Sequence, residues 1–142
     1  MKYVDSNVFI YPVVADERTE AKSASAKKVL LQIATGRLEA ATCYLTWDET
    51  VWVLKKFLGR DLAVAEGKRF LEFPGLKFLR VDGPVVSRAQ DLVAKYEIKP
   101  RDAIHAACAL ENGIREIISD DPDFDDPTLS AGGCLVRAAV RP

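Results

Sequence analysis

Acidic side chains recur in this sequence where predicted strands end or predicted helices begin. Asp5 follows the apolar start of the chain, and Glu49 and Asp102 lie in the first turns of predicted helices. Asp121 and Asp123 follow the strand-like segment IREIIS. Carboxylates gathered in one cleft repel one another, and a divalent cation with oxygen ligands, Mg²⁺ or Mn²⁺, relieves that repulsion. Carboxylates that hold two such ions are suited to in-line hydrolysis of a phosphodiester bond by an activated water.

Each of these acids also has an ordinary structural explanation. Asp5 can cap a helix or occupy a turn, and Glu49 completes the capping-box pattern TWDE over residues 46–49. Asp102 can complement the positive end of its helix, and the acids of 120–126 can form a solvated loop. Their joint position favours the chemical interpretation, because the carboxyl ends of parallel strands meet at one edge of a sheet.

Strand-like and helix-like segments alternate along the whole chain and would position these acids. Strands are predicted over 1–4, 38–44, 76–81, 114–119 and 134–137. Helices are predicted over 23–35, 46–58, 62–73, 84–96 and 100–112, with a short helix or turn over 8–14. Strands separated by helices of this length indicate βαβ crossovers, so we expect an α/β fold with a parallel sheet covered on both faces.

Length and composition describe an ordinary globular protein. The 142 residues predict a single domain spanning 1–142, and 49% hydrophobic with 29% charged residues excludes a disordered chain. The net charge of −1 excludes a polybasic protein, so nucleic-acid binding would need local positive charge. We find no apolar stretch long enough for a membrane span and a poor match to a signal peptide, which predicts a soluble, cytoplasmic protein without a membrane partner.

Cysteine and histidine are too scarce for several common site chemistries. The three cysteines, Cys43, Cys108 and Cys134, are far apart and predict small buried thiols in a reduced compartment. The one histidine, His105, argues against Ser-His-Asp, Cys-His and His-rich metal sites. It lies one helical turn after Asp102, and we expect it to pack or to hydrogen-bond structurally rather than to act as a base.

Four segments, in order, resemble one known family. The opening YVDSNVFI, the segment LTWDETVWVL, the helix RDAIHAACALENGI and the stretch IISDDPDF are similar to the PIN domain family of metal-dependent ribonucleases, and in particular to the VapC toxins of prokaryotic toxin–antitoxin pairs. The resemblance covers nearly the whole chain. It implies a Rossmann-like three-layer α/β/α sandwich with a mainly parallel central sheet of four to five strands.

The resemblance also implies which residues form the site. The metal-site acids would be Asp5, Glu49, Asp102, Asp121 and Asp123, of which the first four would be catalytic. Asp48 is the nearest alternative to Glu49, and Asp120, where many relatives have a polar or basic residue, leaves the fourth assignment open by one position. Substrate contacts would come from Ser6, Asn7, Arg101 and Ser119. Arg101 could grip a phosphate with its guanidinium.

The function that follows is a Mg²⁺- or Mn²⁺-dependent endoribonuclease, the toxin of a VapBC-like pair. Its partners would be RNA, a second copy of the chain in a homodimer, and a small VapB-type antitoxin. A non-catalytic PIN-like binding module and a housekeeping RNA-processing nuclease are the alternatives. A response-regulator receiver and a haloacid-dehalogenase-type phosphatase fit less well, since the phosphatase needs Asp-x-Asp where this chain has Asp5, Ser6 and Asn7.

Two tryptophans on one predicted helix could serve packing or RNA binding. Trp47 and Trp52 are five residues apart and cannot share one narrow helical stripe. We expect one to lie in the core and the other at an edge or interface, with base stacking as the alternative role.

Overall fold

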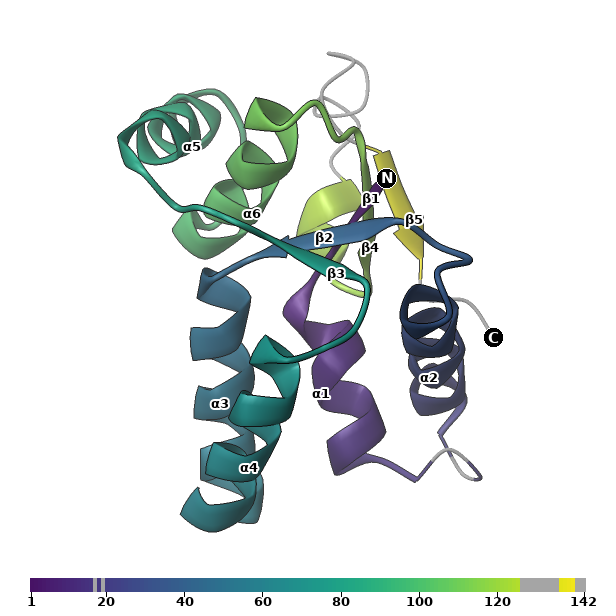
Figure 1. The fold of residues 1–142 in the computed structure, drawn as a ribbon. Coiled ribbons are helices and arrows are strands. Elements are labelled where there is room, and N and C mark those ends of the chain that lie inside the picture. The colour runs from purple at the N-terminus through teal and green to yellow at the C-terminus, as the bar shows by residue number, and fades with distance from the viewer. Residues whose placement is uncertain (17, 19, 126–135, 140–142) are drawn as a thin grey trace.

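Five short parallel strands form the centre of the computed structural model, which describes residues 1–16, 18, 20–125 and 136–139 (Figure 1). The strands are β1 (Lys2–Val4), β2 (Ala40–Cys43), β3 (Leu76–Leu79), β4 (Glu116–Ser119) and β5 (Val136–Ala139). They are ordered β3-β2-β1-β4-β5, and every neighbouring pair is parallel. In chain order, β2 and β3 are added on one side of β1, and β4 and β5 are then added on the other side.

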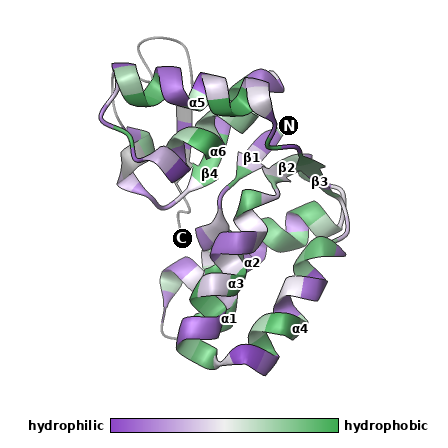
Figure 2. Cartoon of the chain, turned by 90° about the vertical axis from the view of Figure 1, so that its left-hand side faces the viewer, coloured by the Kyte–Doolittle hydropathy of each residue, from purple (hydrophilic) through white to green (hydrophobic). Residues whose placement is uncertain are grey.

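Helices cover both faces of this sheet. They are α1 (Ser6–Val14), α2 (Ala21–Ala34), α3 (Leu45–Leu58), α4 (Arg60–Leu71), α5 (Gly83–Lys95) and α6 (Pro100–Glu111), and a short 3₁₀ turn, η1 (Pro122–Asp125), follows β4. The α5–α6 pair lies on one side of the strands and the group α1–α4 on the other (Figure 2). This arrangement confirms the predicted three-layer α/β/α sandwich.

Alternating side chains of the strands supply the two cores. Tyr3 and Ile117 pack with α5 and α6, whereas the next residues, Val4 and Ile118, pack with α1, α2 and α4. Successive side chains of a strand point to opposite faces, so a strand buried on both faces is apolar throughout. The small residues of α6, such as Ala103 and Ala106, are fully buried and let that helix approach the sheet closely.

The capping box predicted over 46–49 does not form. Helix α3 begins one residue earlier than expected, at Leu45, because β2 ends at Cys43 and the connection is a single residue. Thr46 consequently lies inside the first turn, where its buried hydroxyl is 2.7 Å from that of Thr42. The Glu49 side chain is free of the capping role and turns toward His105 instead.

The prediction that one tryptophan of α3 is buried is also wrong. Trp47 is 39% exposed and Trp52 is 58% exposed. The buried face of α3 is formed by Thr46, Thr50 and Leu54, which recur every four residues. A helix buries one stripe, and both tryptophans lie outside it.

The turn before β3 depends on a glycine. Gly75 has φ +76°, and a Cβ there would lie 2.6 Å from the carbonyl oxygen of Ile33. We expect Gly75→Ala to lower the free energy of unfolding by about 3 kcal/mol, since left-handed strain and a backbone clash add. Gly36→Ala is the matched control: its φ is +72° but nothing lies within 4 Å, so only the strain of about 1 kcal/mol applies. Urea unfolding of both variants measures the difference, and equal losses would contradict the clash.

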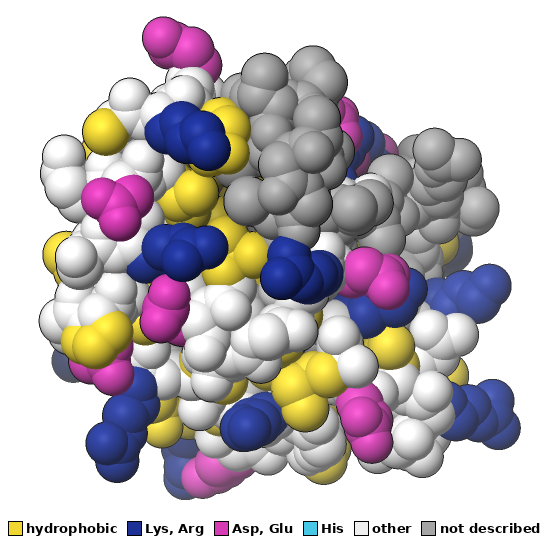
Figure 3. Space-filling model, turned by 90° about the horizontal axis from the view of Figure 1, so that it is seen from above, with side chains coloured by type: hydrophobic (Ala, Val, Ile, Leu, Met, Phe, Trp, Pro, Cys, Tyr) yellow, Lys and Arg dark blue, Asp and Glu magenta, His cyan; other side chains and the backbone are white. Residues whose placement is uncertain are grey.

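Surface and thiol chemistry agree with an ordinary globular protein. Basic and acidic side chains are interspersed on the face shown in Figure 3. Cys43 and Cys108 are buried free thiols, as predicted, while Cys134 lies outside the described residues. None of the helices in the described ranges combines the length and apolar character that a bilayer crossing requires.

Candidate metal centre

The acids converge at the carboxyl edge of the sheet, beside the place where the strand order reverses. Strand β1 ends at Val4 and β4 at Ser119, and Asp5 continues the pairing by donating its backbone N–H to the Ile118 carbonyl at 3.0 Å. Because β2 and β3 extend from one side of β1 and β4 from the other, the helices diverge there and leave a crevice. Asp5 thus lies in the crevice where open α/β sheets usually bind ligands.

Asp5 is buried and held by several hydrogen bonds. Its Oδ1 accepts the Ser6 backbone N–H at 2.7 Å, which also caps helix α1. Its Oδ2 accepts the hydroxyl of Ser119 at 2.6 Å and the side-chain amide of Asn7 at 3.1 Å. Burial raises the pKa of the Asp5 carboxyl, although these hydrogen bonds and nearby His105 act in the opposite direction. The carboxylate is therefore fixed in place, and the imidazole of His105, with Nε2 3.8 Å from Oδ1, is the basic group that faces it.

Glu49 reaches the same crevice from the first turns of α3. Its Oε2 lies 2.8 Å from Nε2 of His105, a fully buried residue of α6. Burial alone would raise the pKa of Glu49, but the hydrogen bond and the charge of His105, with smaller contributions from Ser6 and Arg101, outweigh it and lower the pKa. The neighbouring Asp48 points elsewhere, toward Arg101, with 3.6 Å between Oδ2 and Nη2. Between these two candidates, the structure brings Glu49 to the pocket.

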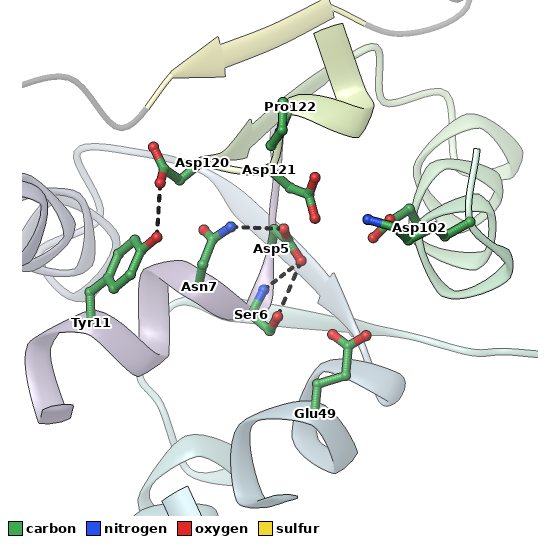
Figure 4. A pocket seen from close by; sticks show the side chains of 10 residues that line it. Asp5, Ser6, Asn7, Tyr11, Glu49, Asp102, Asp120, Asp121 and Pro122 are labelled. Carbon is green, nitrogen blue, oxygen red and sulfur yellow. Dashed lines mark hydrogen bonds between the residues drawn. The ribbon is translucent and has the colours of Figure 1, made fainter. Parts of the chain in front are cut away.

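The remaining acids enter from α6 and from the end of β4. Asp102 is buried in the first turn of α6, and Asp121 lines the crevice opposite it (Figure 4). The backbone N–H of Asp121 donates to the Ser119 hydroxyl at 3.0 Å, which ties this loop to the oxygens of Asp5. The backbone of Asp123 belongs to η1, but its side chain lies outside the described part of the structure.

Asp120 is engaged differently from Asp121. Its Oδ2 accepts the Tyr11 hydroxyl at 2.8 Å and lies 2.6 Å from Nζ of Lys22 (Figure 4 shows the Tyr11 bond). Burial would raise the pKa of Asp120, but Lys22 and the Tyr11 hydroxyl lower it. The adjacent acid, Asp121, is the one whose loop is bonded to the Asp5 cluster. This difference favours Asp121 as the fourth acid.

The predicted substrate-contact residues divide into two groups. Ser6 and Asn7 line the pocket, and Ser119 lies just beneath it as the hub of the Asp5 hydrogen bonds. Arg101 is not among the residues lining this pocket; it is exposed and pairs with Asp48 at its margin. Lys99, from the end of the loop before α6, does line the pocket.

These groups line an open pocket of about 530 Å³. Its lining includes the carboxylates of Asp5, Glu49, Asp102, Asp120 and Asp121 together with the ammonium group of Lys99. Such an excess of negative charge in one cleft raises the energy of the metal-free protein. The donor set suits a hard divalent cation, because most of the available ligands are carboxylate oxygens.

Two further observations fit a bound cation. One ligand atom each from Asp5 and Glu49 lies within 4.8 Å of the other, beside the His105 imidazole. The buried Oδ1 of Asn7, the residue that donates to Asp5, has no hydrogen-bond partner among the described residues. A cation with its water shell would offset the excess negative charge of the pocket and supply a donor for that oxygen.

Comparison with known proteins places the chain in a family. The family model described as PIN domain matches residues 2–128. The chain belongs to the PIN domain family. This match confirms the resemblance carried by the four motifs, and it extends over every acid of the crevice. A search among curated protein sequences found no match.

Solved structures share this PIN fold along the whole chain. The VapC20 toxin of Mycobacterium tuberculosis, described as cleaving the sarcin–ricin loop, is 20% identical over 100% of both chains, with a TM-score of 0.73. VapBC from Salmonella typhimurium, bound to DNA, is 14% identical over 99% of this chain and 98% of that one, with a TM-score of 0.69. VapBC2 from Rickettsia felis, bound to a DNA fragment from the promoter, is 13% identical over 98% of both chains, with a TM-score of 0.68. At these identities the likeness shows the fold.

Some residues of this PIN domain's site were missed by sequence analysis. The Tyr3 hydroxyl lies 2.7 Å from His105 Nδ1. Tyr11 and Lys22 both contact the Asp120 carboxylate. Their partners lie between 98 and 109 residues away in the sequence. No local pattern marks such pairs, and only the order of the strands brings them together.

Proposed function

We propose that this PIN domain is a divalent-metal-dependent endoribonuclease. The observation that carries the proposal is the convergence of Asp5, Glu49, Asp102 and Asp121, from four separate segments, on one pocket at the carboxyl edge of the sheet. Four carboxylates need positive charge to share that pocket, and Mg²⁺ or Mn²⁺ is the ion class that their oxygens select. Family membership supports the same interpretation.

Each acid would contribute differently to ion binding. Asp5 is the most constrained, since Oδ1 accepts from Ser6, the first residue of α1, and Oδ2 accepts from Ser119, the last residue of β4. Glu49 and Asp102 approach from α3 and α6, and Asp121 from the loop after β4. When bound, the ions would lower the pKa of water and stabilise charge on the scissile phosphate. The chain's own part is to hold the carboxylates at fixed positions and to leave one side of the pocket open.

RNA binding would require local positive charge at the rim of an acidic pocket. Lys99 lines the pocket, and Arg101 lies at its margin one residue before Asp102. Ser6 and Asn7 add a hydroxyl and an amide at the N-terminal end of α1, where a helix favours anions. We propose that these groups contact the phosphate backbone, which fixes the position of the RNA without reading its bases.

We further propose that this nuclease is the toxin of a pair with a small VapB-type antitoxin. The similar solved structures include toxin–antitoxin complexes, such as VapBC from Salmonella typhimurium. Helices α3 and α4 also present an apolar groove lined by Trp47, Val51, Val64 and Leu71, among others. Exposed apolar patches of this kind commonly mark protein-binding sites. The predicted homodimer stays a prediction.

Adjacent aspartates provide a sharp test of the nuclease. We expect Asp121→Asn to reduce Mn²⁺-dependent cleavage of RNA by at least about 100-fold, since the substitution removes a charged ligand rather than a supporting hydrogen bond. Asp120→Asn should reduce it by less than about tenfold, because Asp120 already pairs with Lys22 and Tyr11. Gel-based cleavage of a mixed RNA pool by the purified proteins measures both rates.

The controls separate this nuclease from a contaminating one. Cleavage should stop when the ion is removed by EDTA and return when Mn²⁺ is restored. Equal activity of the parent and of Asp121→Asn would refute the assignment of the fourth acid. A parent protein that binds Mn²⁺ but cleaves no RNA would favour a non-catalytic PIN-like binding module.

A further inference from the structure

A chain of buried polar groups leads from the sheet to Glu49. The backbone N–H of Cys43, at the end of β2, donates to the Tyr3 hydroxyl at 3.1 Å. That hydroxyl lies 2.7 Å from Nδ1 of His105, and Nε2 of the same imidazole lies 2.8 Å from Oε2 of Glu49. Tyr3 and His105 are both fully buried. Three elements, β1, β2 and α6, are thus linked to one carboxylate of α3.

The partners determine the direction of these hydrogen bonds. A backbone N–H can only donate, so the Tyr3 oxygen accepts from Cys43. Burial raises the pKa of Tyr3, so the hydroxyl keeps its hydrogen, for which His105 Nδ1 and the neighbouring Cys43 Sγ are the buried acceptors. When Nδ1 accepts from Tyr3 the imidazole is neutral and Nε2 carries the hydrogen; in the imidazolium both nitrogens carry one and the Tyr3 hydrogen turns to Cys43 Sγ. A carboxylate can only accept, so in either state Nε2 is the donor to Glu49 over 2.8 Å.

We infer that His105 is a positioning residue of the metal centre, which holds the Glu49 carboxylate in place through Nε2–H while Tyr3 fixes the ring. The inference rests on the proposed function, because it concerns the way in which a metal-binding carboxylate is oriented. Oε2 of Glu49 faces the imidazole, while the carboxylate, which the Ser6 side chain also contacts, lines the pocket. Ligating carboxylates are commonly held by such outer hydrogen bonds.

The competing role for His105 is that of a metal ligand. Its Nε2 belongs to the group of possible ligand atoms with Asp5 and Glu49, and it lies 3.8 Å from Asp5 Oδ1. A ligating nitrogen must present a lone pair, whereas Nε2 here carries a hydrogen directed at a carboxylate. Ligation through Nε2 would also break the 2.8 Å hydrogen bond to Glu49. The geometry therefore favours the positioning role.

Paired substitutions separate positioning from simple packing. His105→Leu removes the donor and should weaken Mn²⁺ binding about 10- to 100-fold. His105→Gln places an amide N–H near the former Nε2 and should restore most of the affinity, to within about tenfold of the parent. His105→Asn is the matched control, since its shorter amide reaches the Nδ1 position and not Glu49. Mn²⁺ binding to the folded proteins is measured by calorimetry, with thermal unfolding recorded separately.

The single histidine allows a direct readout of the ring. In untagged protein labelled with ¹⁵N-histidine, we expect Nε2 to carry a proton both without metal and with saturating Mg²⁺. Tyr3→Phe should leave that proton in place while weakening Mn²⁺ binding by less than about tenfold, because only the support of the ring is lost. Loss of the Nε2 proton on addition of Mg²⁺ would instead identify His105 as a ligand and overturn the inference.

The outcomes distinguish this inference from the proposed function. If the parent binds Mn²⁺ and cleaves RNA but the Leu, Asn and Gln variants at position 105 bind Mn²⁺ equally, the positioning role is refuted and the nuclease stands. If the parent binds no Mn²⁺ at all, the proposed function fails and the inference fails with it. A graded loss in the order Gln, Asn, Leu, in proteins that remain folded, supports the positioning role.

Discussion

Replacing Asp5 by asparagine is expected to reduce Mn²⁺-dependent RNA cleavage by at least about 100-fold, and to abolish detectable Mn²⁺ binding, without unfolding the protein. Asp5 is the buried acid at the centre of the hydrogen-bond cluster, with Ser6, Asn7 and Ser119 directed at its oxygens. The amide of asparagine keeps the shape of the carboxylate but removes the charge that would hold a cation.

The fold should tolerate this change because the surrounding donors can rearrange. The new amide retains an oxygen for the Ser6 N–H, and its NH₂ group faces Asn7 and Ser119. The Asn7 side chain can turn to present Oδ1, which has no hydrogen-bond partner among the described residues. We therefore expect the rearranged hydrogen bonds of the metal-free variant to cost no more than about 1 kcal/mol of its free energy of unfolding.

The sign of the stability change depends on pH. Burial raises the folded-state pKa of Asp5 above its unfolded value. The stabilising contribution of such a group is fully present below the unfolded pKa and is lost as pH rises through the folded pKa. Without metal, Asp5→Asn should thus gain in stability relative to the parent as pH rises toward 7.5. Asp91→Asn, on the exposed surface of α5, is the matched control and should match the parent in activity and in stability.

Thermal unfolding and RNA cleavage of the two variants measure these effects. Activity that persists in Asp5→Asn would remove Asp5 from the site. Mn²⁺ binding by the folded Asp5→Asn variant at parental affinity would equally contradict the assignment. A variant that is inactive only because it is unfolded would be recognised by the loss of its cooperative thermal transition.

The second large effect concerns metal binding and stability. Mn²⁺ at about 100 times its Kd should raise the free energy of unfolding by about 2.7 kcal/mol at pH 7.5, through preferential binding to the folded chain. For a domain of this size, that gain corresponds to a rise in Tm of roughly 8 °C. The physical cause is the crowding of Asp5, Glu49, Asp102 and Asp121 in one pocket, which the ion neutralises.

This stabilisation should shrink as pH falls. A proton and a cation compete for the Asp5 carboxylate, and the raised pKa of Asp5 lets protons compete at a higher pH than for an ordinary aspartate. We expect the Mn²⁺-induced rise in Tm to fall progressively between pH 7.5 and pH 5. Scanning calorimetry of the parent, Asp5→Asn and Asp91→Asn with and without Mn²⁺ tests this. A shift of equal size at both pH values, or in all three proteins, would mean that the ion binds elsewhere.

Local sequence patterns were sufficient for most of the fold. Apolar runs bounded by glycine, proline and turn residues predict the four strands from β1 to β4, and the helices fall within a few residues of their expected positions, with α5 and α6 starting at Pro-containing turns. These signals are local because backbone preference and helical periodicity act over a few residues. The acids were found in the same way, since each stands at a strand or helix end and the parallel sheet places those ends together.

Errors arose where a residue's role depends on its distant partners. The pattern over 46–49 predicts a capping box, but the one-residue connection to β2 draws Thr46 into the core beside Thr42. Trp47 and Trp52 have the composition of core residues, yet the orientation of α3 against its neighbours leaves both exposed. Neither outcome can be deduced from α3 alone.

The amino-acid sequence was enough to predict an α/β sheet with acids at its carboxyl edge, because those features follow from short-range patterns and parallel strand order. The tertiary structure decided which acid turns to which partner: Asp48 to Arg101, Glu49 to His105, and Asp120 to Lys22 and Tyr11. Neighbours in sequence differ here because packing sets the direction of each side chain. Contacts across about 100 residues form only when the strands assemble in the order β3-β2-β1-β4-β5.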